Sequence, residues 1–211
     1  VGTVAYDSVS TKSGSRENAP GGSAFYFSIS SSFFTSSSLV GVVGSDYSKK
    51  YFSMLEKSGV NIDGLEKVDG ETFRWSGKYN DDDFNQRETL ETHLNVLENF
   101  NPTLNTSNKN SKYLFLANID PKIQNQVLDQ MQTKPKIVAL DTMNFWIDDH
   151  QNNLSSVIEN VDIIFMDENE IKSFTKKDNI ITAAKFVRQL GPRIVIVKKG
   201  EHGAIMFNEG D

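Results

Sequence analysis

The chain has 211 residues, of which 37% are hydrophobic and 24% are charged, and its formal net charge is -6. This length suffices for an α/β domain with a sizeable buried core. Cysteine is absent, which excludes disulfides and thiolate nucleophiles and fits a cytoplasmic location. The acidic balance argues against nucleic acid as a partner, and the absence of an apolar run of roughly 20 residues argues against a membrane.

Strand-like and helix-like segments alternate along the chain. In the first half, strands are expected at 1–6 and 39–43, and helices at 23–34 and 48–58. In the second half, strands are expected at 113–116, 137–140, 163–166, 194–197 and 204–207, and helices at 121–131, 154–160, 168–174 and 180–190. Nearly apolar strands separated by helices indicate a parallel sheet covered on both faces. Such sheets bind ligands beyond the carboxyl ends of their strands.

One stretch, 72–96, breaks this pattern. Residues 72–79 alternate in polarity, Asn80 to Asp83 is a turn signal, and 87–96 alternates in part. We therefore expect a hairpin inserted in the α/β domain. Such a hairpin is a candidate lid, and the alternative is a decorative hairpin at the edge of a sheet.

Two polar features flank the first expected helix. The segment from Gly2 to Asp7 puts the Asp7 carboxylate at the end of a strand, where it can accept hydrogen bonds from two ligand hydroxyls. Strands also end in Asp for turn reasons alone. The pair Gly21-Gly22 precedes the helix and allows a close approach to the backbone, although a tight turn is the alternative.

The spacing of these features resembles the ribokinase/PfkB family of ATP-dependent kinases. That family carries a strand ending in Gly-x-x-x-x-Asp, a Gly-Gly before a helix, a Val-Gly-x-Asp turn and a Gly-Val after the next helix. The chain has all four in order, at 2–7, 21–22, 43–46 and 59–60. The later half agrees, with a strand ending in Asp141, an Asn-x-x-Glu-like segment at 167–170 and a Thr-x-Gly-like segment at 198–200.

The resemblance implies a ribokinase-like three-layer α/β/α fold with a mostly parallel central sheet and a small β-hairpin lid. The domain would span 1–211 and be incomplete at its C-terminus, with a lid insertion at about 71–97 and a second candidate insertion at 8–18. ATP and Mg²⁺ would be the cofactors, and a sugar or nucleoside-like small molecule would be the substrate. Lids in this family often supply dimer contacts, so a homodimer through the lid is a further expectation.

The resemblance also assigns site residues. Substrate would be bound by Asp7, Gly21, Gly22, Arg74 and Asn118, although Arg74 is equally well explained as a surface charge. The nucleotide and its phosphates would lie near Asp141, Asn144, Lys198 and Gly200. Glu170 would act on Mg²⁺ through water, with Asp167 beside it, and the alternative for Glu170 is an exposed first-turn residue that favours the helix dipole.

Three residues depart from the family pattern. Asp167 stands at the Asn of Asn-x-x-Glu and adds negative charge near the expected metal. Lys198 stands at the Thr of Thr-x-Gly, and we expect it to offset the charge of Asp167 and to contact phosphate. Tyr26 stands where many sugar kinases carry Asn, which argues against a ribose- or fructose-like substrate.

The family's Gly-Ala-Gly-Asp motif does not occur in the 211 residues. In the family, its glycines form an anion hole and its Asp takes the proton from the substrate hydroxyl. The resemblance therefore implies a phosphotransferase that moves the γ-phosphate to a hydroxyl, with its catalytic base beyond this chain, so the chain alone would be inactive. No catalytic residue is assigned within it.

Two other functions stay open. A non-catalytic small-ligand-binding protein on the same fold is compatible with Asp167, Lys198 and the absent motif. A dinucleotide-binding oxidoreductase also has a parallel α/β sheet. It ranks below the kinase because the segment from Gly2 to Asp7 is not Gly-x-Gly-x-x-Gly and no acidic residue is placed to bind a ribose.

Overall fold

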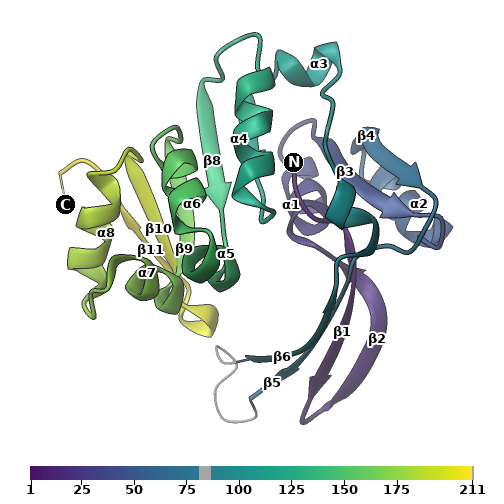
Figure 1. Ribbon diagram of the computed structural model, residues 1–211, viewed down its shortest axis with the longest axis horizontal. Coiled ribbons are helices and arrows are strands. Elements are labelled where there is room, and N and C mark those ends of the chain that lie inside the picture. Colours follow the sequence, from purple (N-terminus) through teal and green to yellow (C-terminus); the bar gives the residue numbers. More distant parts are fainter. Residues whose placement is uncertain (81–86, 211) are drawn as a thin grey trace. The chain divides into compact units, whose positions relative to one another are not determined.

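A computed structural model describes residues 1–80 and 87–210 of the chain (Figure 1). Its internal contacts divide the chain into two compact units, Val1–Asn105 and Thr106–Asp211. Each unit has its own sheets, helices and buried side chains. Within the described part of the chain, no helix is both long enough and apolar enough to cross a membrane.

The first unit contains a four-stranded sheet in the order β2-β1-β5-β6. Its strands are β1 (Ala5–Thr11), β2 (Gly14–Gly21), β5 (Arg74–Tyr79) and β6 (Arg87–His93). β1 pairs antiparallel with β2 and parallel with β5, and β5 pairs antiparallel with β6. The two strands of the predicted hairpin are therefore present. The turn predicted at 80–83 lies outside the described residues except for Asn80.

The rest of the first unit is built on a parallel pair of strands, β3 (Ser38–Gly44) and β4 (Asn61–Val68). With them lie the helices α1 (Ser23–Ser32) and α2 (Lys49–Lys57) and the 3₁₀ helix η1 (Asn95–Asn99). β3 is almost entirely buried, whereas β6 is exposed along its length. Within this unit, the four-stranded sheet projects from the remaining elements as an arm (Figure 1).

The sequence pattern does not predict β2 or β4. Both strands carry polar side chains on both faces and are largely exposed, so they lack the alternation that marks a half-buried strand. The strand expected at 1–6 begins only at Ala5 and continues to Thr11. Its pairing with β2 and β5, rather than its apolar residues, sets these limits.

The second unit contains a five-stranded sheet in the order β11-β10-β9-β8-β7. The strands are β7 (Tyr113–Leu116), β8 (Ile137–Asp141), β9 (Ile163–Asp167), β10 (Ile194–Lys198) and β11 (Ala204–Phe207). β7 to β10 are parallel, and β11 pairs antiparallel with β10. The helices are α3 (Thr106–Lys109), α4 (Pro121–Gln130), α5 (Asn144–Asp149), α6 (Gln151–Ile158), α7 (Glu168–Thr175), α8 (Ile180–Arg188) and the 3₁₀ helix η2 (Gly200–His202).

Side-chain caps mark where helices of the second unit begin. Asp120 accepts a hydrogen bond from the Lys122 N–H at 2.8 Å, and α4 then begins with proline at its first position. The side chain of Asn179 likewise accepts hydrogen bonds from backbone N–H groups at the start of α8. α5 has only six residues and no side-chain cap bond, which explains why the sequence does not predict it.

The strands β8, β9 and β10 are anchored by alternate residues with almost no exposed surface. Leu140, Ile164, Met166 and Val197 are fully buried, and α7 and α8 pack on β9 and β10. Burying such a side chain contributes about 1.5–3 kcal/mol. This packing fixes the polar residues at the carboxyl ends of the three strands, which are Asp141, Asp167 and Lys198.

Candidate functional site

In the first unit, Asp7 on β1 lies against the end of β2. A Cβ atom built on Gly21 would overlap the Asp7 carboxyl group, so only glycine leaves room for it. The backbone N–H of Gly22 donates a hydrogen bond to the carboxyl, and Gly22 has a φ of 90°. Burial raises the pKa of Asp7 to about 6, and the Gly22 bond opposes this shift only in part. We call these three residues the Asp7 cradle.

The Gly21-Gly22 pair is not an isolated tight turn. Gly21 is the last residue of β2, and Gly22 precedes α1. A Cβ on Gly22 would overlap the Thr3 carbonyl, which accepts the Ala24 N–H at 3.1 Å. The close approach of β1 and the start of α1 therefore requires Gly22, whereas Gly21 makes room for the Asp7 carboxyl group.

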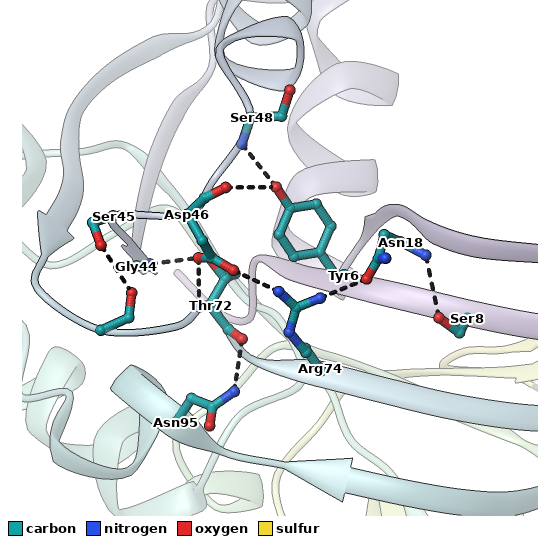
Figure 2. A network of polar contacts seen from close by, with 11 residues as sticks. Tyr6, Ser8, Asn18, Gly44, Ser45, Asp46, Ser48, Thr72, Arg74 and Asn95 are labelled. Carbon is teal, nitrogen blue, oxygen red and sulfur yellow. Dashed lines mark hydrogen bonds and ion pairs between the residues drawn. The ribbon is translucent and has the colours of Figure 1, made fainter.

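Arg74 on β5 is engaged in a network rather than solvated (Figure 2). One guanidinium nitrogen lies 2.6 Å from Asp46 Oδ2, and the other donates to Asn18 Oδ1. The guanidinium also lies over the Tyr6 ring, 4.9 Å from its centroid. The side chain is 30% exposed, so Arg74 is a partly exposed charge that is bound in a network.

Asp46 is the centre of the same network, which sequence reasoning missed. Its Oδ1 accepts hydrogen bonds from the N–H and the hydroxyl of Thr72, at 2.8 and 2.6 Å. The Thr72 hydroxyl oxygen in turn accepts the Gly44 N–H at 3.0 Å. The Tyr6 hydroxyl donates to the Asp46 carbonyl and accepts the Ser48 N–H. The Val-Gly-x-Asp turn at 43–46, which follows β3, is therefore bonded to Tyr6 of β1, to Thr72, which precedes β5, and to Arg74 at the start of β5.

Tyr26 on α1 lies beside the Asp7 cradle. Its hydroxyl donates to the Pro20 carbonyl at 2.6 Å, and its ring packs edge-on against Phe25 with centroids 5.6 Å apart. The residue is nevertheless 56% exposed. Burial and then the neighbouring Asp7 carboxylate raise the pKa of Tyr26. The ring is thus held in place while part of it faces outward.

In the second unit, residues from three strand ends meet. Lys198 at the end of β10 places its Nζ 2.9 Å from Asp141 Oδ1 at the end of β8 and 3.9 Å from Glu170 Oε2. Burial would lower the pKa of Lys198, but Asp141 and Glu170 outweigh it and the net shift is upward. Asp167 is the neighbour of Lys198 in the sheet and helps to raise its pKa, in line with the expected charge offset, but the ion pairs of Lys198 are with Asp141 and Glu170.

Asp167 and Glu170 form a capping box at the start of α7. Asp167 Oδ1 accepts the Glu170 N–H at 2.7 Å, and Glu170 Oε2 accepts the Asp167 N–H at 2.6 Å. Glu170 is only 3% exposed, so the alternative of an exposed first-turn residue is wrong. Burial raises the pKa of Glu170 to about 7, against the opposing effect of Lys198.

The two carboxylates of the capping box bear on the expected magnesium ion. No group of three or more His, Cys, Asp or Glu residues within the described ranges could hold a metal ion by itself. Each carboxylate has one oxygen committed to a backbone N–H, and Asp167 Oδ2 and Glu170 Oε1 take no part in these two bonds. This set fits contact through water with a cation that other groups hold, and Mg²⁺ keeps several of its waters.

The remaining predicted residues of the second unit lie near the ends of β7, β8 and β10. Asn118 follows β7; its amide donates to Met143 Sδ and its Oδ1 accepts the Trp146 indole N–H at 2.8 Å. Asn144 begins α5 and is exposed. Gly200 begins η2 with a φ of 56°, a conformation that favours glycine.

Gln124 on α4 is a further residue that sequence reasoning missed. Its side-chain NH₂ donates to the carbonyls of Ala117 and Asp141, so it fastens together the ends of β7 and β8. It is buried, and within the described part of the chain its Oε1 has no hydrogen-bond partner. A single glutamine in an amphipathic helix gives no signal of this contact.

The fold is that of the ribokinase-like α/β proteins. A nucleoside kinase of Burkholderia thailandensis in complex with inosine has a TM-score of 0.77 and 17% identity, covering 100% of this chain and 72% of that one. A protein of E. coli provisionally named ribokinase II, in complex with ATP and Mg²⁺, has a TM-score of 0.79 and 15% identity, covering 100% and 74%.

Sequence comparisons define the family. The model of the pfkB family carbohydrate kinases matches residues 2–211, so the chain belongs to this family. A cytidine kinase of Thermococcus kodakarensis is 22% identical over 213 residues, which cover 99% of this chain and 74% of that protein. The family resemblance seen in the sequence is thereby confirmed, and kinase activity is the function that the family supports.

Proposed function

We propose that the chain binds both substrates of an ATP-dependent kinase that moves the γ-phosphate to a hydroxyl of a nucleoside or a sugar. The observation that carries this proposal is the Asp7 cradle, in which a carboxyl group lies on glycine backbone. A carboxylate in this setting can accept hydrogen bonds from two hydroxyls of a ligand pressed against the glycines. Membership of the PfkB family supplies the reaction that such a site serves.

Tyr26 favours a nucleoside over a free sugar as the acceptor. Its ring is held by Pro20 and Phe25, lies beside Asp7 and is more than half exposed. A fixed aromatic face next to a hydroxyl-binding carboxylate offers a stacking surface for a planar base. Two of the similar proteins, named a cytidine kinase and a nucleoside kinase bound to inosine, agree with this choice.

On the nucleotide side, Lys198 is the proposed phosphate contact. Its ammonium group is held at the carboxyl edge of the sheet by Asp141 and Glu170 and can exchange one of them for a phosphate oxygen. Gly200 follows β10 and Asn144 follows β8, and they would offer an N–H group and an amide to the nucleotide. Asn118, which follows β7 and is held by Trp146, would offer its amide at the same edge of this sheet.

Asp167 and Glu170 would hold waters of the nucleotide's magnesium ion. When bound, Mg²⁺ neutralises charge on the phosphates and so assists their transfer. The capping box fixes both carboxylates against the start of α7, so they present a constant pair of oxygens to these waters. The nearby Lys198 ammonium limits the excess of negative charge that this arrangement would otherwise carry.

The proton of the acceptor hydroxyl needs a base, and the proposal assigns it to no residue of the 211. In the family pattern the base is the Asp of a Gly-Ala-Gly-Asp motif, which this sequence does not contain. We therefore propose that the chain supplies substrate binding and charge neutralisation, and that a segment outside it supplies the base. The chain alone would bind its ligands without turning them over.

The test is transfer of label from γ-labelled ATP by the full-length protein to a panel of cytidine, inosine, ribose and fructose. We expect label on at least one nucleoside, in the presence of Mg²⁺, and its loss in Asp7→Asn. Binding of ATP without transfer to any member of a broad nucleoside and sugar panel would overturn the proposal.

A second function, a non-catalytic ligand-binding protein, is favoured by one observation. The charge of Lys198 is already neutralised by its ion pairs with Asp141 and Glu170. If these ion pairs do not break, the Lys198 ammonium group has no charge to offer to a phosphate. Tight binding of a nucleoside by the full-length protein, unchanged by ATP and without transfer, would favour this function over the kinase.

A further inference from the structure

A bulge in the first unit lies directly beside Asp7. The antiparallel register of β1 and β2 shifts between Asp7 and Val9, because Asp7 pairs with Ala19 while Val9 pairs with Arg16. Asn18 sits in this bulge with a φ of 49°, in the left-handed region that Asn adopts more readily than most residues. Bulges commonly redirect the side chains next to them.

Asn18 is fixed from three sides. Arg74 donates to its side-chain oxygen, and the Tyr51 hydroxyl donates to its carbonyl at 3.0 Å. Its own N–H donates to the Ser8 hydroxyl at 3.2 Å (Figure 2). A left-handed residue with both backbone groups and its side chain bound is held in one conformation, and so is the bulge.

Arg74 joins this bulge to the rest of the unit. Its guanidinium contacts Asn18 of β2 and Asp46 of the loop after β3 at the same time, while resting on the Tyr6 ring of β1. The planar guanidinium makes the two contacts through separate nitrogens held in a fixed fork, a geometry that a lysine ammonium does not supply. Asp46 itself accepts hydrogen bonds from the buried Thr72, so the carboxyl group that contacts Arg74 is held in place.

Because Asn18 is held in one conformation, the residues that follow it, Ala19 to Gly21, are also held in place against Asp7. Ala19 pairs with Asp7 itself, and Gly21 lies under the carboxyl group. Any shift of the bulge therefore moves Gly21 and Gly22 relative to Asp7. These contacts join β2 and β5 of the four-stranded sheet to the loop after β3.

We propose that Arg74, Asn18 and Asp46 form a positioning clamp that sets the geometry of the Asp7 cradle for its acceptor. Arg74 then acts through Asn18 and does not itself touch the acceptor. The proposal rests on the proposed function for the identity of the ligand, and on the network alone for the geometry of the cradle.

The experiment compares four variants of the full-length protein. Arg74→Met removes the clamp, and Asn18→Gly removes its acceptor oxygen while tolerating the positive φ. Asn18→Asp keeps an oxygen for Arg74 and also tolerates that φ. Lys78→Met removes a cation from an exposed position on the same strand as Arg74 and is the matched control. Affinities for a nucleoside and for a non-hydrolysable ATP analogue are measured by calorimetry.

We expect Arg74→Met and Asn18→Gly to weaken nucleoside binding by about tenfold or more, because small displacements of binding groups are costly. Their affinity for the ATP analogue should stay at the wild-type value. Asn18→Asp should bind the nucleoside with nearly the wild-type affinity, and Lys78→Met should not change this affinity. Unchanged nucleoside affinity in Arg74→Met and Asn18→Gly, or an equal loss of both ligands, would overturn the positioning role.

A measurement without ligand separates this proposal from the proposed function. The Asp7 carboxyl is followed by NMR as the pH is varied, in wild type and in Arg74→Met. Release of the cradle should expose Asp7 and lower its pKa from about 6 toward the ordinary value of about 3.9. If the wild type binds neither nucleoside nor sugar but the Asp7 pKa falls in the variant, the clamp stands and the proposed function fails. An unchanged pKa of Asp7 overturns the clamp.

Discussion

Lys198 at the end of β10 places its ammonium nitrogen 2.9 Å from Asp141 at the end of β8, across the intervening strand β9. The two residues are 57 positions apart in the chain. Their ion pair gathers the carboxyl ends of three strands around a single cation. In the proposed kinase this cation is the group that changes partner when a nucleotide binds.

Replacing Lys198 by Met should weaken binding of an ATP analogue by about 1.5–3 kcal/mol, which is typical for a charged hydrogen bond. Lys199→Met is the matched control, because Lys199 pairs with Glu168 at 3.0 Å and lies outside the cluster. Calorimetric titration of both variants makes the comparison. Equal affinities of the Lys198→Met variant and the wild type would show that phosphate is bound elsewhere.

Replacing Glu170 by Gln should raise the Mg²⁺ concentration needed for half-maximal turnover of the full-length protein. A neutral amide attracts the waters of a cation less strongly than a carboxylate does. Gln keeps an oxygen for the Asp167 N–H, so the capping box and the melting temperature should be preserved. The Mg²⁺ dependence of turnover is the measurement, and identical curves for variant and wild type would contradict the role.

The raised pKa of Asp7 predicts a pH dependence of stability. The folded-state pKa of about 6 lies above the unfolded value of about 3.9, so the folded state binds this proton more tightly. Asp7 therefore lowers the free energy of unfolding as the pH rises from about 4 to about 6, and the loss persists above that range. Asp7→Asn should remove this decline and fold normally. Denaturant unfolding between these pH values compares variant and wild type, and parallel curves would contradict the burial of Asp7.

Tyr26 should decide between nucleoside and sugar. Tyr26→Asn removes the stacking face, so the ratio of nucleoside to ribose affinity should fall by about tenfold, within the range for a stacked base. Tyr26→Phe keeps the ring and loses only the bond to Pro20, so it should retain most of the preference. A loss in Tyr26→Phe equal to that in Tyr26→Asn would mean that the ring face is not the recognition element.

The buried parts of the fold follow well from the sequence. β7 to β10 are short, largely apolar runs in which alternate residues are buried, and their expected limits agree with the structure to within a residue. β2 and β4 escape prediction because their side chains are mostly exposed and their pairing rests on backbone hydrogen bonds. The first residue of a helix was predictable where a capping side chain precedes it, as Asp120 precedes α4.

The sites are harder to predict because their partners are distant in sequence. Asp7 and Gly21 were both expected near the acceptor, but their direct packing depends on the β1–β2 hairpin, whose second strand has no apolar pattern. The contacts of Arg74 with Asn18 and Asp46 span 56 and 28 positions. Such pairs have no local signal, and only the folded register brings them together.

The most direct test of the central claim is whether Asp7 recognises hydroxyls of the acceptor. Calorimetry on the full-length protein would compare a nucleoside that it binds with the 2′,3′-dideoxy analogue, in wild type and in Asp7→Asn. The account predicts that the wild type prefers the parent nucleoside by about tenfold or more, since unpaired polar groups in a binding site are costly, and that Asp7→Asn loses this preference. The same preference in both proteins would contradict it.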